Sequence, residues 1–262
     1  MRKITKVWLI TAGSLVLIGL ILFAVAMSAL KWDFTKLSAS EYETNITEIN
    51  ETFNNISVLT ETADVVFALS DDEICKVECY EDEKSKHTVS VENDTLIVKI
   101  NNQKSWYDYI GFSPNLQKIT VYLPKDYSFG NVDISLSTGD VNMQNTSVGT
   151  LNLSVTTGDA YLTDIVCENL ISSGSSGDIT LNNVLSAGKI SVERSTGDVK
   201  FNDSDAAKIY VKTNTGDVTG NLLSSKVFVT DTNIGSVDVP KTDDGGKCEI
   251  ITSTGDIKIN VN

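Results

Sequence analysis

The feature that most constrains this chain is a Thr-Gly-Asp motif that returns at intervals of 19 or 20 residues. Taken by their glycines, the copies stand at Gly139, Gly158, Gly177, Gly197, Gly216, Gly235 and Gly255. The copy at Gly235 is degenerate, with Ser236 in place of aspartate, and "TETAD" at 60–64 is an earlier copy with Ala63 in place of glycine. A fixed period of this length is typical of a stacked array, in which each unit buries its apolar face against its neighbours.

Apolar and polar residues alternate on both sides of each glycine. The position seven residues before it holds Ile56, Val132, Leu151, Leu170, Ile190, Ile209, Phe228 and Cys248, and the position two residues after it holds Val65, Val141, Ala160, Ile179, Val199, Val218, Val237 and Ile257. This alternation predicts two short strands per repeat and excludes a helical repeat. A propeller blade would need about 40 residues. We therefore expect an all-β protein in which 131–262 form a β-solenoid of parallel strands, with a right-handed course.

Two places in the solenoid depart from the pattern. The coil around 170–178 is soft, because Ser172 and Gly174 replace apolar residues. Arg194 interrupts the inner column of the next coil. We interpret Arg194 as a residue that is already leaving the strand for the turn.

The register breaks between Phe67 and Val132. Four runs there, at 73–82, 87–94, 95–102 and 118–127, are typical of strands. We expect 51–130 to hold the first coil and a cap over the N-terminal end of the solenoid, because exposed strand edges invite aggregation. The insertion 103–115 carries Trp106, Tyr107, Tyr109 and Phe112. It is interpreted either as a hydrophobic plug of the cap or as an exposed binding loop.

The N-terminus predicts a membrane anchor. Residues 7–30 are uncharged, and a helix of that length spans about 36 Å, enough for a hydrocarbon core of roughly 30 Å. Arg2, Lys3 and Lys6 precede this segment, which favours a cytoplasmic tail at 1–6. The expected arrangement is a single transmembrane helix at 7–30 in the plasma membrane, a polar spacer at 31–50 and an extracytoplasmic C-terminal domain. The alternative is a signal peptide, with "AVA" at 24–26 as a cleavage site.

Several stretches together resemble a bacterial family. They are the repeated "STGDV", the run "WYDYIGFS" followed by "ITVYLPKDYSF", and the opening "ILFAVAMSALKWDFTKLSASEYET". The chain is similar to the β-strand-repeat family of low-GC Gram-positive envelopes, often called "putative adhesins", including the lia-type proteins encoded with cell-envelope stress systems. The resemblance implies a membrane-anchored extracytoplasmic β-solenoid. It implies no catalytic residue.

The repeated aspartates form a column in the predicted stack, namely Asp140, Asp159, Asp178, Asp198, Asp217 and Asp256, with Asp64 in register. Ionised neighbours in such a column repel, so something must offset the repulsion. The favoured interpretation is a structural corner, in which glycine supplies φ > 0 and aspartate accepts backbone N–H bonds. The alternatives are a calcium ladder and a groove for a surface polysaccharide or peptide.

Composition narrows the choice of partners. The formal net charge is −14, and no basic stripe is available to neutralise nucleic acid. Cys75 and Cys79 lie four residues apart on a predicted strand, roughly 13 Å, which is too far for a disulfide. A zinc site would need tighter cysteine pairs and histidine, and His87 is the only histidine. We expect four unpaired buried cysteines and no cofactor.

The preferred function is a non-enzymatic, adhesin-like binding or envelope-stress-related scaffold. Its partner would be an envelope protein or a cell-wall polymer. A polysaccharide-active β-helix enzyme is the alternative, but equivalent aspartates are a poor acid–base pair and no Ser-His-Asp set is expected around His87. A third possibility is an end-to-end polymer, because "IKINVN" runs to the last residue with no evident cap.

Overall fold

The computed structural model describes residues 3–33, 41–71, 74–103, 117–125 and 127–262. The described chain separates into two compact units, one with helix α1 (Lys3–Ala29) and the other with all the strands. The strands are β1 (Tyr42–Ile49), β2 (Asn55–Leu69), β3 (Cys75–Asp82), β4 (Ser85–Glu92), β5 (Thr95–Asn102), β6 (Gln117–Leu123), β7 (Ser128–Thr138), β8 (Val141–Thr157), β9 (Ala160–Ser176), β10 (Ile179–Thr196), β11 (Val199–Thr215), β12 (Val218–Leu222), β13 (Lys226–Ile234), β14 (Val237–Asp238), β15 (Gly246–Thr254) and β16 (Ile257–Val261).

Helix α1 is apolar on every side. Its segment Ile4–Ala29 has a mean hydropathy of 2.6, and none of its most apolar stretch of 18 residues is buried inside the protein. By length and composition it could cross a membrane, as a lasting anchor or as a signal sequence.

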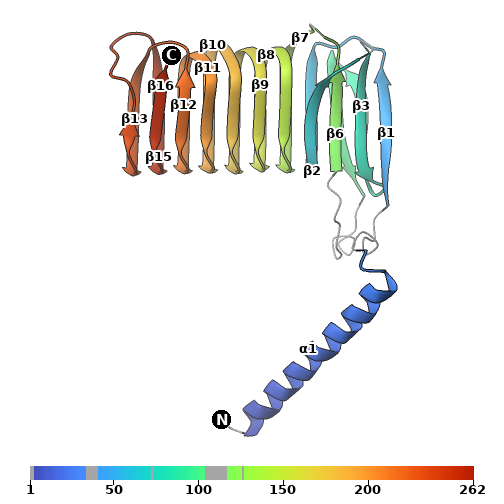
Figure 1. Ribbon diagram of the computed structural model, residues 1–262. Helices are drawn as coiled ribbons and strands as arrows, with labels where there is room; N and C mark the ends of the chain where they lie inside the picture. The colour runs from blue at the N-terminus through green and yellow to red at the C-terminus, as the bar shows by residue number, and fades with distance from the viewer. Residues whose placement is uncertain (1–2, 34–40, 72–73, 104–116, 126) are drawn as a thin grey trace. The chain divides into compact units, whose positions relative to one another are not determined.

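Each solenoid coil is one long strand that bends and closes with a Gly-Asp corner. Strands β8, β9, β10 and β11 pair in parallel, with Val141 opposite Ala160, Ala160 opposite Ile179 and Ile179 opposite Val199. They lie side by side in Figure 1. The predicted columns are therefore rows of neighbouring side chains, and the all-β solenoid is confirmed.

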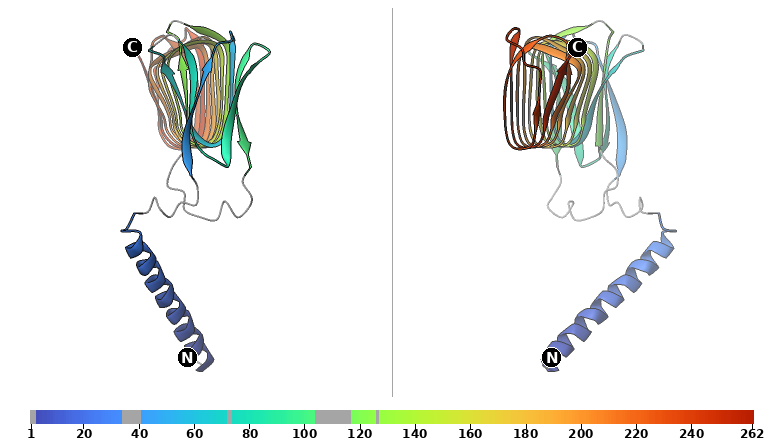
Figure 2. Two further views of the ribbon diagram at one scale, coloured as in Figure 1. Left: turned by 90° about the vertical axis from the view of Figure 1, so that its right-hand side faces the viewer. Right: turned by 60° about the vertical axis from the view of Figure 1, so that its left-hand side comes forward.

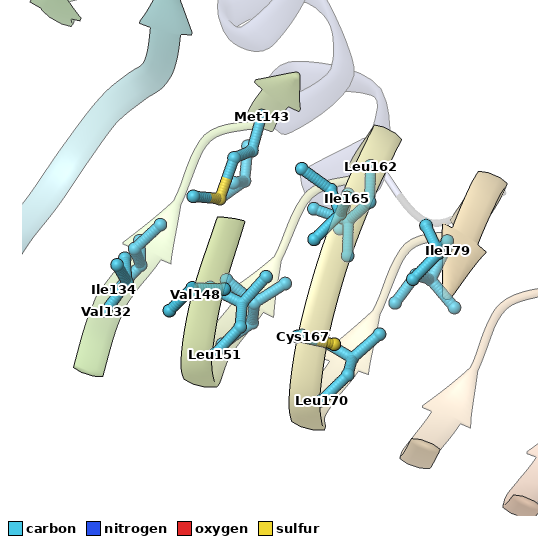
Figure 3. Close-up of a cluster of buried hydrophobic side chains, with 14 of the residues drawn as sticks. Val132, Ile134, Met143, Val148, Leu151, Leu162, Ile165, Cys167, Leu170 and Ile179 are labelled. Atoms are coloured by element: carbon cyan, nitrogen blue, oxygen red, sulfur yellow. The ribbon is translucent and has the colours of Figure 1, made fainter. Parts of the chain in front are cut away.

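The interior of the coils is filled by these columns. Figure 2 shows the coils as nested loops around it, and Figure 3 shows Leu162 and Ile165 at one end of the buried cluster and Cys167 and Leu170 at the other. Leu151, Leu162 and Leu170 are fully buried. Burying a side chain of this size contributes about 1.5–3 kcal/mol.

The N-terminal end is covered by parallel strands and, beyond them, by strands of the opposite direction. Strand β2 is the first coil, with Ile56 opposite Val132. Its other edge pairs in parallel with β5 and β6, which pair antiparallel with β4 and β3 respectively. Asn93 and Asp94, at φ 49° and 62°, form the tight turn between β4 and β5. The four strands expected from the sequence are all present.

The interval predicted as a polar spacer contains a strand. Within 31–50, β1 pairs antiparallel with β3 from Tyr42–Asp82 to Ile49–Cys75. The prediction was wrong for this part because "YETNITEI" buries only Ile49. Its backbone hydrogen bonds with β3, rather than an apolar face, place it at the sheet edge.

The last two coils are stacked out of chain order. Strands β15 and β16 pair with β11 and β12 on one side and with β13 and β14 on the other. In Figure 1, β16 lies between β12 and β13. The more apolar final coil, with Ile250 and Ile257 fully buried, thus takes the inner place. The degenerate coil forms the end, where Phe228 is only partly buried.

Two glycines allow the last coil to enter between the coil that contains β11 and the coil that contains β13. A Cβ on Gly245 would lie 1.9 Å from the carbonyl oxygen of Ser225, and one on Gly246 would lie 1.9 Å from that of Ala207. The terminal Asn262 then donates its N–H to the Leu222 carbonyl.

Arg194 does not leave the strand, so the earlier interpretation was wrong. It stays paired opposite Gly174 and is only 4% exposed. Its guanidinium donates to the Val155 carbonyl at 3.3 Å and to Ser172 Oγ at 3.1 Å. A Cβ on Gly174 would lie 1.7 Å from Arg194 Nη1. The soft coil therefore makes room for the arginine of the next coil. Burial lowers the pKa of this guanidinium, while Asp159 and Asp178 oppose the shift.

The four cysteines are free and buried, as predicted. Burial raises the pKa of Cys75 to about 11 and that of Cys248 to about 12. We therefore expect the folded chain at pH 8 to resist iodoacetamide, because the thiolate is the reactive form. After denaturation without reductant, mass spectrometry should count four alkylated thiols. Rapid labelling of the folded chain, or fewer than four labels after denaturation, would contradict this description.

The packing of Arg194 predicts a paired mutational effect. Gly174→Ala should lower the free energy of unfolding by about 2–4 kcal/mol, because the guanidinium must leave its place. Adding Arg194→Thr, which copies Thr213 at the same position of the next coil, should recover only the part of the loss that comes from the guanidinium, because the new Cβ would also lie 2.2 Å from the Val155 carbonyl oxygen. Thermal and denaturant unfolding of the single and double variants measure both effects. Additive losses would show that the two residues do not share this space.

Candidate functional site

In the Gly-Asp corners, the backbone of each glycine lies directly against the backbone of the neighbouring coil in the stack. The φ angles of the seven glycines lie between 126° and 153°, a region that other residues rarely adopt. A Cβ on Gly158 would also lie 2.0 Å from the carbonyl oxygen of Gly139. Ala63 begins the column without a positive φ. Glycine is thus required at corners that stack on the corner of another coil.

The aspartates of these corners form a directional ladder of hydrogen bonds. The backbone N–H of Asp159 donates to Asp140 Oδ1 at 2.8 Å, and the N–H of Asp178 donates to Asp159 Oδ1 at 2.8 Å. The same contact joins each further pair, from Asp140 on Asp64 to Asp256 on Asp217, at 2.7–2.9 Å. One oxygen of each carboxylate therefore holds the next coil. These bonds to N–H dipoles offset repulsion along the column.

The final rung is made by Ser236. Its N–H and its hydroxyl both donate to Asp256 Oδ1, at 2.7 and 3.0 Å. These hydrogen bonds lower the pKa of the Asp256 carboxyl. A lowered pKa in the folded state means that this contribution to stability is present at neutral pH and is lost as the pH falls through the folded pKa. The serine that makes the copy degenerate in sequence therefore preserves its contact.

A calcium ladder finds little support in this geometry. Among the described residues, three His, Cys, Asp or Glu ligand atoms lie within 4.8 Å of one another only at Cys79, Glu81 and His87. No three aspartates of the column meet that condition. Calcium takes six to eight oxygen ligands, whereas each corner offers one carboxylate that already accepts an N–H.

A second corner, which the sequence analysis missed, lies six residues after the glycine. Asn145, Asp164, Asn183 and Asp203 have φ of 48–55° there. Asparagine and aspartate tolerate this left-handed conformation better than other residues do, apart from glycine. Asn183 also donates to Asp164 Oδ1 at 2.6 Å across the coils. The Asn/Asp column at this position is the signal that could have revealed it.

A groove of about 620 Å³ follows this second corner and crosses several coils. At positions eight to ten after Gly158, Gly177, Gly197 and Gly216, it is lined by Val166, Cys167, Leu185, Ser186, Ala187, Asp205, Ala206, Ala207, Ser224, Ser225 and Lys226, together with Gly245 and Gly246. Val166 and Leu185 are 55% and 37% exposed. Lys226 is 2% exposed and forms an ion pair with Asp205 at 2.5 Å. The groove is thus largely apolar, with a buried cation at one end.

Two sequence expectations concern residues outside the aspartate column. The proposed binding residues Trp106, Tyr107, Tyr109 and Phe112 lie outside the described residues. His87 does gain a triad-like pair of neighbours, Thr60 Oγ1 at 2.9 Å and Glu81 Oε2 at 2.8 Å. This is a Thr-His-Glu arrangement rather than the Ser-His-Asp set considered in the sequence, and its Thr60 comes from β2, 27 residues before His87. Thr60 is only 3% exposed, so its hydroxyl is closed to a substrate.

The corner geometry predicts opposite outcomes for neighbouring substitutions. Gly158→Ala should cost at least about 3 kcal/mol, from backbone strain and the contact with Gly139. Asp159→Asn keeps an acceptor for the Asp178 N–H and should change stability by less than about 0.5 kcal/mol. As the matched control, Ala63→Gly should cost only about 0.5–1 kcal/mol of chain entropy. Unfolding midpoints of the full chain, with calcium and with chelator, measure these effects. A chelator-induced loss of stability that disappears in Asp159→Asn would instead indicate a metal ladder.

Comparison with solved structures finds matches at low identity. A putative cell adhesion protein from Clostridium sporogenes shares 12% identity, with 85% of this chain and 100% of that chain covered and a TM-score of 0.39. A putative adhesin from Bacteroides fragilis shares 17% identity, with 86% and 99% covered and a TM-score of 0.49. A putative adhesin from Parabacteroides distasonis shares 11% identity, with 84% and 98% covered and a TM-score of 0.40. No curated protein matches the sequence.

The sequence profile of one family covers most of the strand-rich unit. The profile of Toastrack DUF4097 matches residues 53–262, from just before the first coil to the end of the chain. The chain therefore belongs to the Toastrack DUF4097 family.

Proposed function

We propose that this protein is a membrane-anchored binding scaffold on the extracytoplasmic side of the plasma membrane, without catalytic activity. Helix α1 would remain as the anchor, and the solenoid would present a rigid surface to an envelope component. The groove across successive coils carries the proposal, because an extended, mostly apolar surface with few polar groups suits binding rather than chemistry.

The partner that suits this groove is an extended chain. Its lining residues occupy equivalent positions in successive coils, so a peptide or wall polymer lying along the stack would contact several coils at once. The exposed apolar residues Val166 and Leu185 would cover its apolar parts. A role in envelope stress would follow if the partner belongs to that response.

The absence of catalysis is inferred from the equivalence of the corner aspartates. Asp140, Asp159 and Asp178 each accept the N–H of the next coil. Acid–base catalysis needs two groups whose surroundings push their pKa values apart. A repeated contact supplies no such difference.

A polymer formed end to end is the second candidate function. The end coil favours it, because Phe228 and Val239 are only partly buried there and, among the strands that the structure describes, β13 pairs with β15 alone. An unpaired strand edge can accept a strand of another chain. Concentration-dependent fibres of the full chain, suppressed by Val229→Lys on β13, would favour this candidate.

The proposed orientation predicts the outcome of protease treatment. Arg2, Lys3 and Lys6 should keep the N-terminus in the cytoplasm. Protease added to intact protoplasts should therefore digest the strand-rich unit, while a tag at residue 1 stays protected until the membrane is opened. Protection of the strand-rich unit would reverse the orientation, and its release into the medium would indicate a cleaved signal sequence.

The groove predicts position-specific crosslinking in intact envelopes. A photo-crosslinking amino acid at Ala187, in the groove, should capture an envelope component. The matched position Lys200, exposed after the Gly-Asp corner, should not. Val166→Asp should weaken the Ala187 product at least tenfold. Equal products at Ala187 and Lys200, or none at Ala187, would contradict a binding role for the groove.

A further inference from the structure

A buried polar cluster lies where the first coil meets its N-terminal cap. Cys79 and Glu81 come from β3, His87 from β4 and Thr60 from β2. The side chains of His87 and Glu81 are 0% and 1% exposed, and Cys79 is 2% exposed. The potential ligand atoms of Cys79, Glu81 and His87 all lie within 4.8 Å of one another.

We propose that Cys79, Glu81 and His87 form a binding site for a zinc ion. The set offers one sulfur, one nitrogen and one oxygen donor, which are the donor types that Zn²⁺ takes in proteins. The thiol disfavours Ca²⁺ and Mg²⁺, which prefer oxygen ligands. Three protein ligands leave a fourth position for a water molecule.

Hydrogen bonds from neighbouring strands fix the orientation of the Glu81 carboxylate, as the binding of a metal requires. Asn45 Nδ2 donates to Glu81 Oε1 at 2.8 Å, and the backbone N–H of His87 donates to Oε2 at 2.6 Å. Such outer contacts fix the direction of a metal-binding carboxylate. They also connect β1, β3 and β4 through one side chain.

The imidazole of His87 can exchange a hydrogen bond for a metal bond without losing its second partner. Nδ1 lies 2.8 Å from Glu81 Oε2, and Nε2 lies 2.9 Å from Thr60 Oγ1. In the tautomer with its proton on Nδ1, His87 donates to Glu81 Oε2 and the Thr60 hydroxyl donates to Nε2. With zinc on Nδ1, the ring proton sits on Nε2 and donates to Thr60. A hydroxyl can do both, because it is donor and acceptor.

The fit requires a small opening. Two ligand atoms about 2.0 Å from a tetrahedral zinc ion lie about 3.3 Å apart, whereas Nδ1 and Oε2 are 2.8 Å apart. A movement of about half an ångström by either side chain supplies the difference.

Charge and protons also balance. Of the partners that the structure gives the Glu81 carboxylate, Asn45 and His87, only His87 can carry positive charge. A buried carboxylate is costly unless it is paired or bound to a metal. Cys79 is a free thiol in the metal-free chain. Binding breaks the S–H bond, forms a Zn–S bond and releases one proton to solvent.

The test is metal titration of the full chain in detergent micelles after removal of metal by a chelator. Cobalt(II) serves as the spectroscopic probe, since a thiolate ligand gives a near-ultraviolet charge-transfer band. We expect this band to saturate at one equivalent. Zinc should displace the cobalt and raise the unfolding temperature by several degrees at a concentration of about 100 times the Kd.

The chain offers a matched pair of variants. Cys75→Ser alters a buried thiol on the same face of β3 but outside the cluster, so it should keep the band and the zinc-induced shift. Cys79→Ser should lose the band and weaken zinc binding at least tenfold. No band and no zinc-induced shift in the unmodified chain would overturn the proposal. So would loss of the band in Cys75→Ser with retention in Cys79→Ser. The cobalt band and the zinc-induced shift of the unmodified chain test the proposal even if Cys79→Ser fails to fold.

Discussion

The structure depends on the in-register stacking of each coil on the coil before it. Parallel strand pairing aligns like residues in columns, so every coil is supported only by its neighbours. The Gly-Asp corner fixes that register at one point per coil. Its glycine allows two backbones to approach, and its aspartate holds the N–H of the next coil. In the sequence this aspartate is a candidate for metal binding or catalysis, but in the structure its carboxylate accepts the backbone N–H of the next coil.

Departures from the repeat follow the same constraint. Arg194 can lie inside the stack because Gly174 and Ser172 leave it space and a partner. Ser236 can replace aspartate because, at the end of the stack, it needs only to donate to Asp256. Each exception is explained by its neighbouring coil rather than by its own sequence. This is why the unusual residues occur beside one another in the stack although they lie about 20 positions apart in the chain.

Much of the solenoid could be predicted from the sequence, because its columns have a period that side-chain alternation reveals. The order of the last two coils could not, since one coil edge resembles another and only Gly245 and Gly246 indicate a close passage. Strand β1 escaped prediction because it is fixed by backbone pairing with β3 rather than by an apolar face. The cluster around His87 escaped because Thr60, Glu81 and His87 meet only through the cap topology. The calcium and corner interpretations were both compatible with the spacing. Only the contacts across coils distinguish them.

The direction of the aspartate ladder allows the most direct test of this account. Asp159 accepts the N–H of Asp178 but donates its own N–H to Asp140. Native-state hydrogen exchange of the amides of Asp159 and Asp178 should therefore be measured in the unmodified chain and in Asp159→Ala. Protection is expected to fall at residue 178, whose acceptor is removed, and to persist at residue 159, whose acceptor Asp140 remains. Equal loss at both amides, or loss at residue 159 alone, would contradict it.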